Sequence, residues 1–195
     1  MRFRSVAVLS VFLACGGGGE TTAPGEFVRV KMAVASANLF RGQSDQLGAT
    51  PVDAAGRTVT GAGTASWNSS NTAVATVDGS GVVRAVGLGS SDIVATIGAF
   101  SGTTRVTVTQ APLAVTVSMP GLSFSPFQSF VRQGGTVNFE FPQLAHNVIF
   151  QSSSAPADIG IVSNVRVSRQ FNTLGEFRYD CTLHPGMSGQ VDVLP

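Results

Sequence analysis

Residues 176–193 read EFRYDCTLHPGMSGQVDV, and this stretch decides the fold of the C-terminal half of the chain. Its two ends, 176–179 and 190–193, alternate polar and apolar side chains, as strands with one buried face do. Between them Cys181, His184 and Met187 follow one another at three-residue steps. The sequence therefore predicts a strand, then a loop that carries a thiol, an imidazole and a thioether, and then a second strand.

The surrounding residues show the same period of two. Further runs at 113–117, 136–141, 147–150 and 165–167 have the composition of short strands. Phenylalanine is concentrated here, at positions 124, 127, 130, 139, 141, 150, 171 and 177. We therefore expect a β-sandwich or small barrel with a stiff aromatic core.

A second set of strand patterns precedes this one. Runs at 28–32, 73–77, 81–86, 93–97 and 104–108 are separated by turn residues, which predicts an antiparallel sandwich. This part contains no cysteine, so its core would depend on side chains such as Trp67 rather than on a disulfide. The tripeptide at 110–112, which ends in Pro112, is interpreted as a hinge. The predicted fold class is all-β.

Composition excludes several classes of function. The 195 residues carry 12 basic and 11 acidic side chains, so there is no basic field to neutralise nucleic acid. Two cysteines cannot build a disulfide scaffold, and two histidines exclude sites that need many imidazoles. A Ser-His-Asp catalytic arrangement is not indicated either. We expect no enzyme activity and no small-molecule substrate.

The first residues look like a targeting segment. Arg2 and Arg4 precede an apolar run at 6–14, and Cys15 and four glycines follow it directly. The run is too short to span a bilayer, which needs about 20 apolar residues. The sequence FLAC at 12–15 resembles the lipobox of bacterial lipoproteins. That resemblance implies a signal peptide at 1–14, a lipidated Cys15 and a lipid-anchored place in the cell envelope, in the periplasm or at the cell surface. The Gly-rich composition and the lack of apolar periodicity predict a flexible tether at 15–26. An ordinary signal peptide is the alternative.

Four segments of the first half carry a family resemblance. WNSSN at 67–71, VATVD at 74–78, GVVRA at 81–85 and VGLG at 86–89 are similar in order and spacing to the bacterial immunoglobulin-like group 2 repeat. The resemblance covers residues 27–109 and implies an Ig-like sandwich that acts as a spacer or an adhesion element. We expect no chemistry in this domain.

The loop residues and one distant histidine form a possible metal site. His146, the only histidine besides His184, lies just before a predicted strand. A thiolate, two imidazoles and a weak thioether are the ligand set of a blue-copper electron-transfer site. Cu(I) favours soft sulfur, whereas imidazole suits both oxidation states, so little has to move when one electron is exchanged. Zinc is the competing metal, although a structural zinc site would prefer a fourth thiolate or hard donor over Met187.

The C-terminal half also resembles a known family. GGTVNF at 134–139, HNV at 146–148, GEFRYDC at 175–181 and MSGQVDV at 187–193 are similar to the cupredoxins, specifically the plastocyanin and amicyanin group, over residues 112–195. The resemblance implies a Greek-key sandwich that holds one type 1 copper ion. Its equatorial ligands would be His146, Cys181 and His184, and Met187 would be axial. Asn147 would tie the two ligand loops together.

The same resemblance implies a route for electrons. In the family the loop histidine reaches the surface within an apolar patch, so His184, with Leu183 and Pro185 beside it, is the predicted electron port. Brief complexes with redox proteins are the expected partners. Two other functions stay open: a copper carrier or resistance lipoprotein, and adhesion through the Ig-like domain. A disulfide between Cys15 and Cys181 is a further alternative that would abolish the site.

Overall fold

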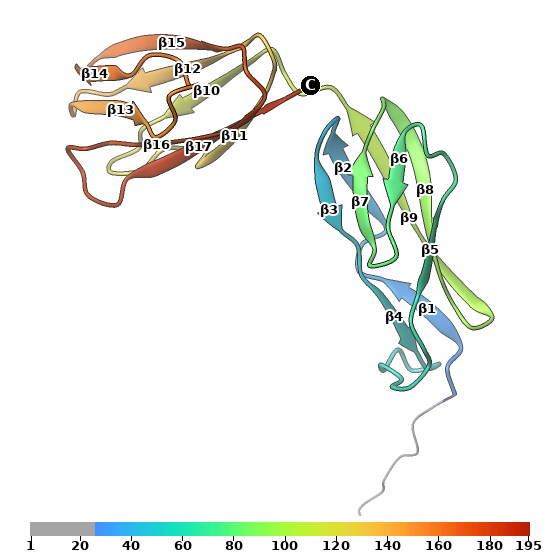
Figure 1. Cartoon of the computed structure of the whole chain (residues 1–195). Coiled ribbons are helices and arrows are strands. Elements are labelled where there is room, and N and C mark those ends of the chain that lie inside the picture. Colours follow the sequence, from blue (N-terminus) through green and yellow to red (C-terminus); the bar gives the residue numbers. More distant parts are fainter. Residues whose placement is uncertain (1–25) are drawn as a thin grey trace, which may run out of the picture.

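The structure, a computed structural model, describes residues 26–195, which form strands and no helix (Figure 1). The prediction of an all-β fold is confirmed. The predicted signal peptide, Cys15 and nearly all of the tether lie outside the described residues. In the part that is described, no helix has the length and apolar character to cross a membrane.

The first nine strands build the N-terminal sandwich. They are β1 (Arg29–Met32), β2 (Ser36–Phe40), β3 (Ser44–Gln46), β4 (Ala49–Val52), β5 (Ser66–Ser69), β6 (Ala75–Val77), β7 (Val82–Ala85), β8 (Gly89–Ile97) and β9 (Phe100–Thr109). One sheet has the order β2-β9-β8-β5, a second has the order β3-β7-β6, and β1 pairs with β4. Ile93, Val83 and Val106 are fully buried between the two larger sheets.

Trp67 fulfils its predicted packing role from the edge of this sandwich. It is only partly buried, yet it contacts both the main cluster and a smaller one around Val30, Ala95 and Ile97. The indole ring fits because residue 81 is glycine: a Cβ there would lie 2.7 Å from Trp67 Cζ2. Trp67 therefore joins two small cores that neither sheet could enclose alone.

The other eight strands build the C-terminal sandwich. They are β10 (Ala114–Ser118), β11 (Gln128–Arg132), β12 (Gly135–Phe141), β13 (His146–Phe150), β14 (Ile159–Val162), β15 (Val165–Phe171), β16 (Gly175–Asp180) and β17 (Ser188–Leu194). One sheet has the order β10-β12-β15, and the other has the order β11-β17-β16-β13-β14.

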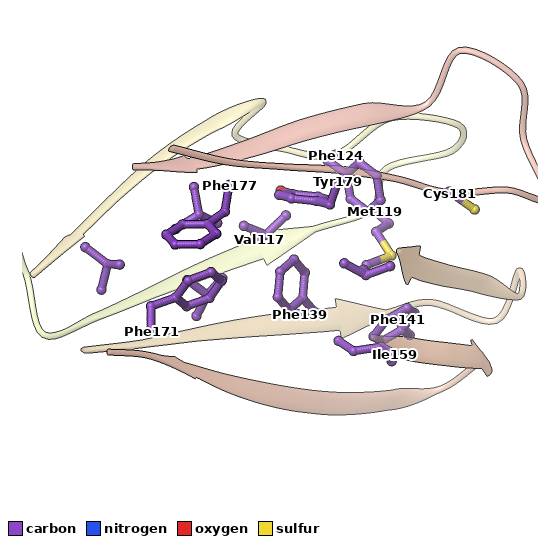
Figure 2. Close-up of a cluster of buried hydrophobic side chains, with 14 of the residues drawn as sticks. Val117, Met119, Phe124, Phe139, Phe141, Ile159, Phe171, Phe177, Tyr179 and Cys181 are labelled. Carbon is purple, nitrogen blue, oxygen red and sulfur yellow. The ribbon is translucent and has the colours of Figure 1, made fainter. Parts of the chain in front are cut away.

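An aromatic core fills the space between these two sheets, and Cys181 lies at one end of it (Figure 2). Strand β12 shows the cause, because its residues alternate strictly between buried and partly buried. Phe139, which is fully buried, meets Tyr179 edge to face with ring centroids 5.4 Å apart. Phe150 contacts Tyr179, Phe139 and Phe171 in the same manner. Such pairs add about 0.5–1.5 kcal/mol each beyond the burial of their area.

Two features of the pairing differ from the sequence prediction. Strands β2, β3, β4, β5, β11 and β14 were not expected. In the N-terminal sandwich, which was predicted to be antiparallel, the pair β2–β9 is parallel. In the C-terminal sandwich, for which no strand direction was predicted, the pairs β10–β12 and β11–β17 are parallel. The missed strands are short, and most lie at sheet edges, where one partner is enough. Strand β3, for example, is exposed at all three residues, so no apolar period marks it.

We predict that truncation of the core aromatic destabilises the C-terminal domain. Phe139→Ala should lower its free energy of unfolding by about 3–5 kcal/mol, because a fully buried ring is lost. Urea denaturation followed by far-ultraviolet circular dichroism measures this. Phe127→Ala is the matched control, since Phe127 is 59% exposed and its loss should be nearly neutral. Equal losses in the two variants would contradict the assignment of the core.

Candidate metal centre

Strand pairing brings the two distant parts of the site to the same end of the C-terminal domain. His146 is the first residue of β13, and Cys181 directly follows the last residue of β16. The two strands are antiparallel neighbours in the five-stranded sheet, with Ile149 opposite Asp180. The start of one strand and the end of the other therefore meet, although 35 residues separate the histidine and the cysteine in sequence.

Backbone hydrogen bonds shape the loop from Cys181 to Met187. The amide of His184 donates to the Cys181 carbonyl at 3.3 Å, and the amide of Met187 donates to the His184 carbonyl at 3.0 Å. The amide of Cys181 then donates to the Met187 carbonyl at 2.9 Å, which closes the loop. Gly186 adopts φ of +85°, a conformation that favours glycine. The three-residue spacing read from the sequence thus corresponds to two successive turns.

The donor atoms lie at distances that suit one shared ion. Cys181 Sγ is 3.7 Å from His146 Nδ1 and 3.4 Å from His184 Nδ1, and the ligand atoms of the three residues all fall within 4.8 Å of one another. Sulfur and nitrogen donors that bind one ion at about 2.3 and 2.0 Å, at near tetrahedral or trigonal angles, are about 3.5–3.8 Å apart. The structure therefore brings these three predicted ligands together with little rearrangement needed.

Burial prepares His146 for ligation. The residue is fully buried, and this desolvation lowers the pKa of its imidazole, with a further lowering from the neighbouring His184. The neutral ring is the form that binds metal. Its Nδ1 faces the thiol, whereas its Nε2 is buried and has no hydrogen-bond partner among the described residues. On the Nε2 side, the imidazole of His146 is therefore held by the side chains packed around it and not by a hydrogen bond.

Met187, the fourth predicted donor, ends the loop that begins at Cys181. It is 3% exposed and belongs to the same buried cluster as Cys181. The thioether is therefore inside the domain at the end of the loop, next to the hydrogen bond that its backbone makes with Cys181. The four predicted donors share one end of the sandwich, and within residues 26–195 no other group of three His, Cys, Asp or Glu side chains is close enough to share an ion.

Asn147 joins the two donor segments, as expected. Its amide Nδ2 donates to Thr182 Oγ1 at 2.8 Å, and its Oδ1 accepts a bond of 2.8 Å from the Thr182 backbone amide. The two bonds connect residues that each directly follow a donor, His146 and Cys181. Sequence reasoning did not identify Thr182 as the partner; its place directly after Cys181 was the one available signal.

The predicted electron port is partly open to solvent. Leu183 is 41% exposed and Pro185 is exposed, whereas His184 between them is only partly exposed. The imidazole of His184 faces Cys181 through Nδ1. His184 is consequently the donor residue that connects the buried thiol with the surface.

Parts of the chain are similar to known proteins. Residues 27–109 match the family model of the bacterial Ig-like domain (group 2), which confirms that predicted resemblance. Solved structures that resemble the chain include a reduced, Cu(I) form of an amicyanin variant, with 27% identity over 41% of this chain and 81% of the other and a TM-score of 0.38. Another is amicyanin from Paracoccus versutus, with 26% identity over 41% and 80% of the two chains and a TM-score of 0.37.

One curated relative aligns over a longer stretch. Ice-binding protein 1 of Shewanella frigidimarina is 35% identical over 139 residues, which is 70% of this chain. The matched part is only 15% of that protein's length.

We predict that Asn147 supports metal binding through Thr182. Asn147→Ala removes both hydrogen bonds between the donor loops and should weaken metal affinity by about 10–100-fold, as the loss of a ligand-orienting bond does. Thr182→Val removes one of the two bonds and keeps the other, so its effect should be smaller. Competition titration with a colorimetric chelator measures the affinity. A Thr182→Val loss larger than that of Asn147→Ala would contradict this role.

Proposed function

We propose that this chain, which joins a group 2 bacterial Ig-like domain to a sandwich with a cluster of one cysteine and two histidines, is a type 1 copper protein that transfers single electrons. The observation that carries the proposal is the position of Cys181 Sγ, 3.7 and 3.4 Å from the Nδ1 atoms of His146 and His184. Met187, buried at the end of the same loop, would complete the soft donor set that distinguishes such a site from structural zinc sites.

A bound copper ion would supply a one-electron couple at this position, and the residues around it would determine how readily that couple exchanges. His146 contributes a neutral imidazole, because burial keeps its pKa low. Cys181 contributes sulfur inside the apolar cluster, away from water. Because the protein provides all four donors, no position is left for a substrate, which favours an electron carrier over an enzyme.

The surroundings of the site limit its motion. One donor begins β13 and the others follow β16, both interior strands of the five-stranded sheet. The paired hydrogen bonds of Asn147 and Thr182 hold the two segments in register at 2.8 Å each. Donors held in this way need little rearrangement between oxidation states, which supports rapid electron exchange.

Electrons would leave and enter through His184. Its ring is the donor that reaches the surface, and Leu183 and Pro185 flank it with uncharged side chains. An uncharged surface of this kind suits brief contacts that bury little area and separate quickly. The partners would be other redox proteins.

The place of action is the cell envelope. The FLAC motif at 12–15 supports lipid attachment at Cys15, and a bacterial Ig-like domain between the anchor and the copper domain would act as a spacer. The copper domain would then work at a distance from the membrane surface.

We predict that Cu(II) added to the chain without residues 1–15 produces a strong thiolate-to-copper absorption in the visible range and a narrow hyperfine splitting in electron paramagnetic resonance. Cys181→Ser should abolish both signals, because the thiolate produces them. A colourless protein, or one that prefers zinc, would overturn the electron-transfer proposal. Retained copper with slow redox cycling would favour a carrier role instead.

We also predict that charge at the port slows electron exchange. Leu183→Glu should lower the rate of electron self-exchange between Cu(I) and Cu(II) forms, measured by nuclear magnetic resonance line broadening, because two carboxylates would face each other in the encounter. The absorption spectrum should stay unchanged. Leu174→Glu, at a similarly exposed leucine (49%) in the β15–β16 turn, is the matched control. Equal rates in the two variants would contradict the assigned port.

A further inference from the structure

The two domains touch beside the short segment that connects them. Phe40 at the end of β2 packs against Phe130 of β11, with ring centroids 5.8 Å apart. The Gln110 side-chain amide donates to the Pro195 carbonyl at 2.5 Å. Figure 1 shows the end of β17 next to this connection, whereas the loop between β16 and β17 lies at the far end of the C-terminal domain. The donor cluster is thus remote from the joint.

The connecting segment, which was predicted to be a hinge, is short and partly packed. Ala111 is 3% exposed, so its side chain is packed rather than solvated. The carbonyl of Thr109 accepts from the Arg41 amide at 2.9 Å, and the carbonyl of Pro112 accepts from the Arg132 amide at 2.9 Å. Each end of the segment is therefore fixed to a different domain, and only two residues lie between the anchored carbonyls.

Gly42 allows the close approach of the domains. It follows β2 in the turn before β3, and a Cβ there would lie 2.7 Å from Pro195 Cδ and 3.1 Å from Pro195 Cγ. A proline ring cannot rotate out of the way as a flexible side chain could. The turn itself is held by bonds from the Gly42 amide to the Ala85 carbonyl and from the Gln43 amide to the Phe40 carbonyl, both at 3.0 Å. A methyl group at residue 42 would thus push against the other domain.

The contact is confined to one side of the joint. On another side a cleft of about 420 Å³ separates Gln43 and Ser44 from Phe130, Glu176 and Asp192. Besides the Gly42 contact, the Phe40–Phe130 pair and the Gln110–Pro195 bond connect the two domains. A single methyl group added at residue 42 therefore tests whether the two domains are held together at this contact.

We infer that the facing ends of the two domains form a fixed interface. The Ig-like domain and the C-terminal domain then keep one relative orientation, and the Ig-like domain acts as a rigid arm. The interface consists of the aromatic pair Phe40–Phe130, the hydrogen bond from Gln110 to Pro195 and the packing of the Pro195 ring against Gly42. The arm holds the donor end of the second domain in one direction, away from the joint. Where the proposed electron transfer applies, partners reach His184 from that direction only.

The test is nitrogen-15 relaxation on the metal-free chain from residue 16 onward, which retains every described strand. Amides of both domains should fit one rotational diffusion tensor in the unsubstituted protein. Gly42→Ala should separate the two domains, each with a shorter correlation time. Phe130→Ala, which removes the aromatic pair without altering a glycine, should shift the correlation times in the same direction.

Gly63→Ala is the matched control. Gly63 has the same φ of +96° as Gly42 but no atom within 4 Å of its added Cβ, so it shares the backbone strain and lacks the contact. It should leave the single diffusion tensor intact. Independent tumbling of the domains in the unsubstituted protein, or equal effects of Gly42→Ala and Gly63→Ala, would overturn the inference. Neither result would affect the copper proposal, because the measurement needs no metal.

Discussion

The site depends on one constraint, the antiparallel pairing of β16 with its two neighbours. The pair β13–β16 places His146 beside Cys181, and the pair β16–β17 closes the loop that carries His184. Because side chains alternate with a period of two, a slip of one residue in either pair would turn the donors to opposite faces of the sheet. The register of three strands therefore defines the donor set.

The aromatic core makes that register difficult to change. Phe177 and Tyr179 on β16 point inward and contact rings from other strands, so a slip of one residue would expose them. Tyr179 shows how dry this region is: its hydroxyl is buried without a hydrogen-bond partner among the described residues, and burial raises the pKa of the phenol. The same apolar surroundings lower the pKa of His146. The exclusion of water from this region thus accounts both for the raised pKa of Tyr179 and for the lowered pKa of His146.

The two domains divide the work between them. The Ig-like domain contributes no residue to the donor cluster, and its own interior is held by Trp67 and small aliphatic side chains. Its influence on the second domain passes through a few contacts around Gly42 and Pro195. The Ig-like domain has no donor residue, but through these contacts it can still influence the direction in which the donor cluster of the C-terminal domain faces.

The sequence by itself determined the features that are local along the chain. Strand periodicity predicted the all-β fold, and the spacing from Cys181 to Met187 predicted a compact donor loop, because each depends on a few neighbouring residues. Only the tertiary structure decided the partner of Asn147, the parallel pairs and the burial of Ala111 between the two domains' strands. These depend on contacts between residues far apart in sequence, such as Asn147 with Thr182, and no local period records which distant backbone a segment will meet.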